Sequence, residues 1–168
     1  MTVGRITRAA VLTAVALTIF LVELRIPSLT PIPGVKLGLA NIVTVFSMFL
    51  LGPADTLAIL LARILLGSTF AGQVMALAYS LAGGMLCYLV MLLLRRLLTR
   101  RQIWVCGVLG AVAHNVGQIA VAILVTRTPA LVSYLPVLLL SGIVTGLLTG
   151  LAAQFAVNRM SGLFEPKK

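Results

Sequence analysis

Long apolar segments with almost no charged side chains are the feature that most restricts how this chain can fold. Charged residues make up 10% of its 168 residues and hydrophobic ones 61%, with a mean hydropathy of +1.17. Soluble domains carry roughly 25% charged residues, so this composition could not cover a soluble fold. In a bilayer only helices and closed barrels satisfy every backbone polar group. The alternation of barrel strands is absent, so we expect an all-α integral membrane protein with one transmembrane domain, residues 1–168.

Clusters of glycine, proline and arginine divide the chain into apolar segments. We expect six transmembrane helices, at residues 5–23, 36–51, 54–67, 72–94, 102–126 and 131–157. The second and third are shorter than the ~20 residues of a full span, and they could instead form one re-entrant hairpin. Two spans are favoured, because an odd number of crossings before the basic loop at 95–101 would place that loop outside.

The basic residues are distributed unequally between the two expected sides of the membrane. With both termini in the cytoplasm, the inner side holds Arg5, Arg8, Arg95, Arg96, Arg100, Arg101, Arg159, Lys167 and Lys168, and the outer side holds Arg25, Lys36 and Arg127. Positive residues accumulate on the cytoplasmic side of membrane proteins. We therefore expect both termini on the inner side of the cytoplasmic membrane, and attribute the net charge of +10 to topology and not to nucleic-acid binding.

Polar side chains inside a membrane are costly, which makes them candidates for function. In the expected topology, seven lie between the midplane and the outer surface: Lys36, Asn41, Arg63, Gln73, His114, Asn115 and Gln118. A polar layer open to the outside suits a pocket for an amphipathic solute. The basic groups suit phosphate or carboxylate, and the amides can read the edge of a heterocycle through paired donors and acceptors. We expect these residues to bind a substrate.

Structural roles are alternatives for several of these residues. Arg63 could form an ion pair with Glu23, at the end of the first helix. His114 could hydrogen-bond a neighbouring helix, and Asn41 could cap a backbone break near Gly38. The sequence leaves both readings open.

Small residues four positions apart occur in the first and last apolar segments. The motifs are Ala10-x-x-x-Ala14 and Gly142-x-x-x-Gly146-x-x-x-Gly150. Membrane helices associate through close backbone contact at such residues. For the last segment we expect packing within the bundle, whereas the first could equally serve a partner protein.

Catalysis is poorly supported by the residue types present. The acidic residues are Glu23, Asp55 and Glu165, too scattered to hold magnesium on a diphosphate. There is no Walker-type phosphate loop and, with one histidine, no histidine-based metal cluster. Asp55 follows Pro53 and suits the first turn of the third helix, near the positive end of its dipole. We expect no enzyme activity, metal or resident cofactor.

The first seventy residues hold the most specific motifs. They are Ile26-Pro27-Ser28, Pro33-Gly34-Val35-Lys36-Leu37-Gly38-Leu39-Ala40-Asn41, Leu50-Leu51-Gly52-Pro53-Ala54-Asp55 and Ala62-Arg63-Ile64-Leu65-Leu66-Gly67-Ser68. With them the chain resembles the Gx transporter family, also described as heptaprenyl diphosphate synthase component I. That family is similar to the S components of energy-coupling factor (ECF) transporters, and the resemblance covers most of the chain.

The resemblance implies a six-helix bundle that binds a vitamin from the outer side. S components dock through an Ala-x-x-x-Ala motif in the first helix onto a membrane coupling subunit driven by two ATPases. Ala10 and Ala14 match that motif, and residues 25–36 would act as a lid. Members similar to flavin transporters imply riboflavin, FMN or FAD as cargo. Another vitamin or an isoprenoid role, including an accessory subunit of a prenyl diphosphate synthase, remains the alternative.

Overall fold

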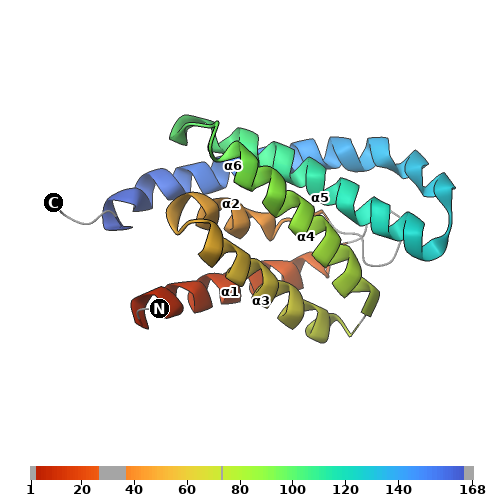
Figure 1. Cartoon of the computed structure of the whole chain (residues 1–168), viewed down its shortest axis with the longest axis horizontal. Helices are drawn as coiled ribbons and strands as arrows, with labels where there is room; N and C mark the ends of the chain where they lie inside the picture. Colours follow the sequence, from red (N-terminus) through yellow and green to blue (C-terminus); the bar gives the residue numbers. More distant parts are fainter. Residues whose placement is uncertain (1–2, 27–36, 73, 165–168) are drawn as a thin grey trace.

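The computed structural model describes residues 3–26, 37–72 and 74–164, with side chains described up to Met160. Lys36, Gln73 and nearly all of the expected lid lie outside these residues. The described chain forms α1 (Val3–Glu23), α2 (Asn41–Leu50), α3 (Pro53–Ala71), α4 (Val74–Leu94), η1 (Arg100–Gln102), α5 (Ile103–Thr126), η2 (Pro129–Tyr134) and α6 (Leu135–Phe164). All of these elements are helical (Figure 1).

Five of the helices are long and apolar enough to cross a membrane: α1, α3, α4, α5 and α6, the last two counted with the short helices before them. The chain is therefore a multi-pass helical membrane protein. Helix α2 has only 10 residues and is about 15 Å long, which is half of the hydrocarbon thickness of a bilayer.

Helix α2 is the centre of the bundle, since it contacts each of the other five α-helices. Seven of its residues are buried: Asn41, Val43, Thr44, Val45, Phe46, Ser47 and Met48. Around it, α5 packs closely on α4 and α6, whereas α1 packs chiefly on α3. A helix too short to span a bilayer is thus enclosed by the other helices.

The ends of the helices alternate between two sides of the bundle. At the left of Figure 1, α1 begins, α2 connects to α3, α4 connects to α5, and α6 ends. At the right, α3 connects to α4 and α5 to α6. Among the described basic residues near helix ends, Arg25 and Arg127 belong to the right side; the others, Arg5, Arg8, Arg95, Arg96, Arg100, Arg101 and Arg159, belong to the left.

The expected start of the second helix at residue 36 is wrong, because α2 begins at Asn41. Gly38 has a φ of +78°, in the left-handed region that interrupts a right-handed helix. Residues 39–40 form a turn. A glycine is needed there, because most side chains are strained at positive φ. Asn41 consequently lies at the first turn of α2, next to this break.

The third helix is longer than expected, with 19 residues ending at Ala71 and not near residue 67. Gly67 does not stop it: a Cβ at that position would lie 2.9 Å from Cε1 of Phe20, so glycine lets α1 approach α3. Gly72, with a φ of +64°, provides the left-handed C-cap that commonly ends helices. The last helix likewise continues past the expected end at 157, to Phe164.

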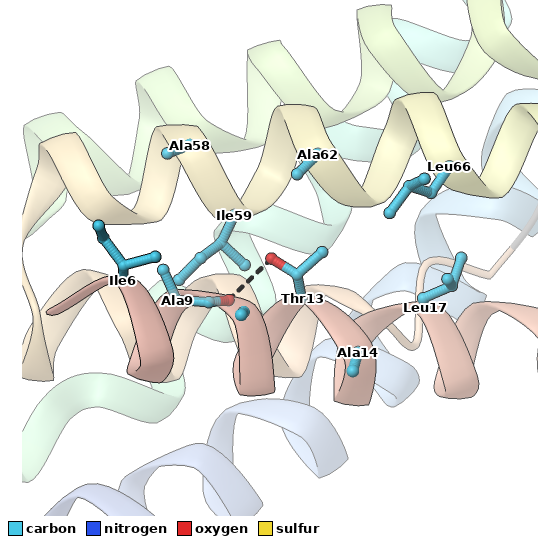
Figure 2. Close-up of a pocket in the computed structure, with 10 residues that line it drawn as sticks. Ile6, Ala9, Thr13, Ala14, Leu17, Ala58, Ile59, Ala62 and Leu66 are labelled. Carbon is cyan, nitrogen blue, oxygen red and sulfur yellow. Dashed lines mark hydrogen bonds between the residues drawn. The ribbon is translucent and has the colours of Figure 1, made fainter. Parts of the chain in front are cut away.

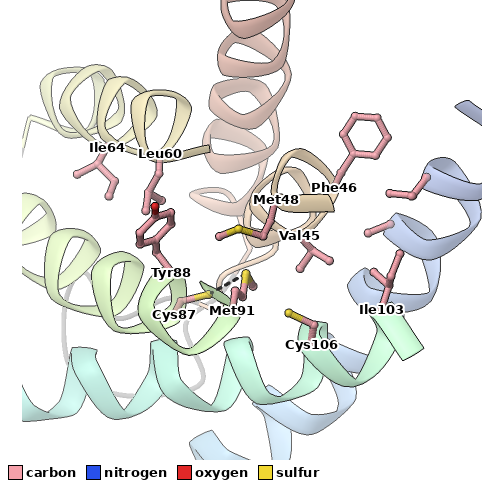
Figure 3. Packing of buried hydrophobic residues seen from close by; sticks show 12 residues of the cluster. Val45, Phe46, Met48, Leu60, Ile64, Cys87, Tyr88, Met91, Ile103 and Cys106 are labelled. Carbon is pink, nitrogen blue, oxygen red and sulfur yellow. Dashed lines mark hydrogen bonds between the residues drawn. The ribbon is translucent and has the colours of Figure 1, made fainter. Parts of the chain in front are cut away.

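The main hydrophobic core joins α2 to its neighbours (Figure 3). It includes Val45, Phe46 and Met48 of α2, Leu60 and Ile64 of α3, Cys87, Tyr88 and Met91 of α4, and Ile103 and Cys106 of α5. Both cysteines are free thiols with 0% exposure. They serve as small buried apolar groups.

The glycines of α6 pack within the bundle, as expected. A Cβ on Gly146 would lie 2.7 Å from the Cα of Val108, and one on Gly150 would lie 2.7 Å from the carbonyl oxygen of Trp104. The backbones of α5 and α6 therefore touch along this stripe, the arrangement that small residues allow in membranes.

Candidate functional site

The turn before α2 is fixed by the last residue of α1. Glu23 is 3% exposed, and its two carboxylate oxygens accept hydrogen bonds from the backbone N–H groups of Gly38 and Leu39, at 2.6 and 3.0 Å. Hydrogen bonds to a carboxylate are stronger than those between neutral groups. Glu23 therefore ties the end of α1 to the start of α2 across an apolar interior.

The turn at Gly38 and Leu39, which we call the clamped turn because Glu23 holds it, brings together two of the expected binding residues. A Cβ on Gly38 would lie 2.8 Å from Nδ2 of Asn41 and 3.0 Å from Cδ2 of His114. The side chains from α2 and α5 therefore meet over the backbone of Gly38, although 73 positions separate them in sequence (114 minus 41). Only a residue without a side chain fits between them.

His114 and Gln118 share one face of α5, as their spacing of four predicts. That face is pressed against Gly83 of α4, where a Cβ would lie 2.9 Å from Nδ1 of His114 and 3.0 Å from Cγ of Gln118. Both side chains are buried. The glycine in α4 thus makes room for two polar side chains between α4 and α5.

Arg63 reaches the same region from α3. Its side chain is 4% exposed, and its guanidinium carbon lies 5.9 Å from the centre of the Phe20 ring, within the range of a cation–π contact. Phe20 lies one turn before Glu23 on α1, so the guanidinium is near the end of α1 that carries this carboxylate. This placement is in keeping with the structural alternative of an Arg63–Glu23 pair.

Several buried polar atoms in this region lack a hydrogen-bond partner among the described residues. They are Nδ2 and Oδ1 of Asn41 and Nη2 of Arg63. A buried polar atom left without a partner costs about 1–3 kcal/mol, and more when the group is charged. Two donors and one acceptor are therefore buried in this part of the bundle without a partner in the described chain.

Asn115 has a different environment from its neighbour His114. Its Nδ2 donates to the carbonyl oxygen of Leu138 at 2.6 Å, and a Cβ on Gly142 would lie 2.7 Å from the same nitrogen. Asn115 is thus held at the contact of α5 with α6, away from the face of α5 that carries His114. Its Oδ1 has no partner within the described chain.

A groove runs between α1 and α3, with a volume of about 520 Å³ (Figure 2). It is lined by Ile6, Ala9, Ala10, Thr13, Ala14, Leu17, Ala58, Ile59, Ala62 and Leu66. Ala10 and Ala14, the motif expected to dock a partner, are exposed on α1 and are not covered by other helices. The only hydroxyl in the lining, that of Thr13, donates to the carbonyl oxygen of Ala9 at 2.8 Å.

The wall of the groove on α3 was missed by the sequence analysis. Ala58 and Ala62 are four residues apart, the same spacing as Ala10 and Ala14. That signal was present in the sequence. Its meaning depends on the pairing of α1 with α3, which only the structure supplies.

An ion pair joins the same two helices near the start of α1. Nε of Arg5 donates to both carboxylate oxygens of Asp55, at 2.8 Å each. Asp55 lies in the first turn of α3, as expected, after Pro53 at the start of the helix. Asp55 therefore interacts favourably with the positive end of the α3 dipole, and it also stabilises the contact between α1 and α3.

Among the described residues, no group of three or more histidine, cysteine, aspartate or glutamate side chains could hold a metal ion. The fold and the buried polar side chains define a small multi-pass helical membrane protein with polar groups enclosed in its bundle. By sequence it belongs to the family described as heptaprenyl diphosphate synthase component I, which it matches over residues 12–156. No curated protein and no solved structure matches the chain.

Proposed function

We propose that this protein is the substrate-binding subunit of a transporter for a vitamin or cofactor, and not an enzyme. The observation that carries the proposal is the set of unsatisfied buried atoms on Asn41 and Arg63, beside a turn that Glu23 holds in place. Polar groups enclosed in a membrane bundle and left without protein partners suit a ligand that supplies those partners.

The membrane arrangement in this proposal has six crossings, with both ends of the chain in the cytoplasm of a bacterium. Helix α2, enclosed by the other helices, would belong to the sixth crossing. The side where α1 begins and α6 ends would face the cytoplasm, because it holds most of the described arginines and positive residues favour that side. Glu23 and Gly38 then lie toward the outer surface.

A flavin is the cargo we propose. The pyrimidine edge of the isoalloxazine ring offers carbonyl acceptors on either side of an N–H donor. The amide of Asn41 has one unsatisfied donor nitrogen and one unsatisfied acceptor oxygen, and Arg63 has a further donor. These complementary groups can form hydrogen bonds with such an edge.

For energy coupling, the groove between α1 and α3 is the proposed docking site for a membrane coupling subunit with two ATPases. The argument is that Ala10 and Ala14 are exposed, and that Ala58 and Ala62 form the facing wall. Small residues on both walls allow a partner helix to approach closely. The role itself is inferred from the resemblance to S components.

The alternative function is an accessory membrane subunit of a prenyl diphosphate synthase. It is favoured by the description of the family to which the chain belongs. An apolar groove of about 520 Å³ could accommodate part of an isoprenoid chain. Co-purification with a soluble synthase, together with a gain in its rate, would support this alternative; a synthase indifferent to the protein would oppose it.

The experiment that tests the proposed function is flavin binding by the purified protein in mild detergent. Its absorbance and fluorescence would first be examined for bound flavin; riboflavin, FMN and FAD would then be titrated by quenching of their emission. We expect saturable binding of one flavin per protein, weakened in Asn41→Ala and Arg63→Gln. Asn158→Ala, at an exposed position of α6, is the control and should bind normally. If no flavin binds, the flavin assignment is wrong.

A further inference from the structure

Two opposite charges are buried near the clamped turn. Among the described residues, the buried charged side chains are Glu23, Asp55 and Arg63. Asp55 is paired with Arg5 at the other end of α1, which leaves Glu23 and Arg63 at the site. These two opposite charges compensate each other in the described part of the site.

Glu23 is fixed in position by bonds that use its negative charge. Both oxygens accept backbone N–H groups, an arrangement that only acceptors can make and that stabilises the ionised carboxylate. Phe20, one turn earlier on the same face of α1, places its ring by the guanidinium of Arg63. The end of α1 therefore holds both a counter-charge and an aromatic face against that arginine.

The balance of charges restricts which ligands the site can accept. An unbalanced charge is costly where the surroundings are apolar and poorly polarisable. A phosphate monoester would bring a charge of about −1.5 to −2 to a site where the arginine is already balanced by a carboxylate. An uncharged ligand adds no such imbalance, and its carbonyl oxygen can still accept from Nη2 of Arg63.

We propose that Glu23 is a positioning residue that also sets the charge selectivity of the site, so that the site takes a polar ligand whose buried part carries no net charge. This inference rests on the proposed function and narrows it: among flavins, riboflavin should be preferred to FMN and FAD. It also revises the expectation that Arg63 serves a phosphate or carboxylate. The charge of Arg63 is matched by the protein, and the ligand receives a hydrogen bond.

The test compares matched ligands that differ mainly in charge. Riboflavin is paired with FMN, nicotinamide with nicotinate, and farnesol with farnesyl diphosphate, and dissociation constants are measured for the whole chain in detergent. For whichever pair binds, we expect the uncharged member to bind at least tenfold more tightly. In Glu23→Gln, which keeps one acceptor oxygen but leaves Arg63 unbalanced, this ratio should shift at least tenfold toward the anionic member.

Two further variants keep the inference open to disproof if Glu23→Gln fails to fold. Arg63→Gln leaves the carboxylate unbalanced and should reject anionic ligands more strongly than the unmodified protein does. The double variant, Glu23→Gln with Arg63→Gln, is neutral again and should regain the original preference. A purely structural role for Glu23 would weaken both members of a pair equally and leave the ratio unchanged.

The outcomes separate the inference from the proposed function. If a ligand binds but the ratio does not change in these variants, or if the unmodified protein prefers the anion, the charge inference is wrong while the binding function stands. If an uncharged ligand other than riboflavin binds with the expected ratios, the inference is supported and only the flavin is wrong. If no member of any pair binds, the proposed function is wrong and the inference with it.

Discussion

Gly107 of α5 and Gly150 of α6 lie so close that a Cβ on Gly107 would stand 2.5 Å from the Cα of Gly150. Because backbone meets backbone here, no side chain can rotate away to make space. The apolar tails of lipids compete with helix packing on equal terms, so such close contacts are what holds membrane helices together. The pairing of α5 with α6, which also holds Asn115, depends on them.

The first prediction follows from this contact. Gly107→Ala should lower the melting temperature of the protein in detergent, because forced overpacking costs about 1–3 kcal/mol. Gly4→Ala is the matched control: nothing lies within 4 Å of a Cβ at that position, and alanine favours a helix. Equal stability of the two variants would mean that α5 and α6 are further apart than described.

The second prediction separates the two buried asparagines. Asn41→Ala should reduce ligand affinity at least tenfold with little loss of thermal stability, because the amide makes no hydrogen bond within the described chain. Asn115→Ala should be less stable by about 0.5–1.5 kcal/mol, since it loses the bond that Nδ2 donates to the carbonyl oxygen of Leu138, while that oxygen keeps the bond from Oγ of Ser141. Thermal melting and ligand titration of both variants check this; the reverse pattern would remove Asn41 from the site.

The third prediction concerns the groove between α1 and α3. Ala10→Leu with Ala14→Leu should abolish uptake of the cargo into cells while leaving binding by the purified protein unchanged, because the bulky side chains fill the groove and not the buried cluster. Val11→Leu, an exposed position of α1 outside the groove, should affect neither. Normal uptake by the double variant would contradict docking at this groove.

The fourth prediction concerns the ion pair between α1 and α3. Arg5→Gln should lower the melting temperature more than Asp55→Asn does, because it leaves the carboxylate, which is 6% exposed, without its partner, whereas Asp55→Asn leaves an arginine side chain that is 44% exposed. The positive end of the α3 dipole offsets part of the cost of the unpaired carboxylate. A double-mutant cycle by thermal melting isolates the pair itself; an additive cycle would mean that the two side chains do not interact.

The fifth prediction tests the orientation in the membrane. A cysteine placed at Thr128 should react with a membrane-impermeant maleimide added to spheroplasts, and one at Leu97 only after the membrane is opened. Both positions are exposed, and the native thiols, Cys87 and Cys106, are fully buried and give no background. Labelling of the cysteine at 97 from outside would invert the proposed topology.

The existence of the helices could be predicted from sequence because each long apolar run must satisfy its backbone internally. The ends of the helices could not be predicted, because a glycine can either interrupt a membrane helix or let a neighbouring helix pack closely against it. Gly67 lies at an expected helix end but packs against Phe20 within α3, whereas Gly38 lies in an expected helix but adopts a positive φ before α2. The difference lies in the neighbouring helix, which no local pattern reveals.

The candidate site could likewise be predicted only in part from the sequence. The residue types of Asn41, Arg63, His114 and Gln118 marked them as unusual, and they are indeed buried in the bundle. The position of Glu23 against the backbone of Gly38 and Leu39 could not be predicted. It depends on the meeting of the ends of α1 and α2, which the sequence separates by a proline-rich segment.

The lining of the groove between α1 and α3 has a consequence for how strongly anything can bind there. In the bilayer this surface is already covered by acyl chains, so a protein helix that enters it exchanges one apolar neighbour for another. Its affinity must come from the closer fit that Ala10, Ala14, Ala58 and Ala62 permit. A helix bound in the groove should therefore be held by packing alone, and its affinity should vary with the length and saturation of the surrounding lipids.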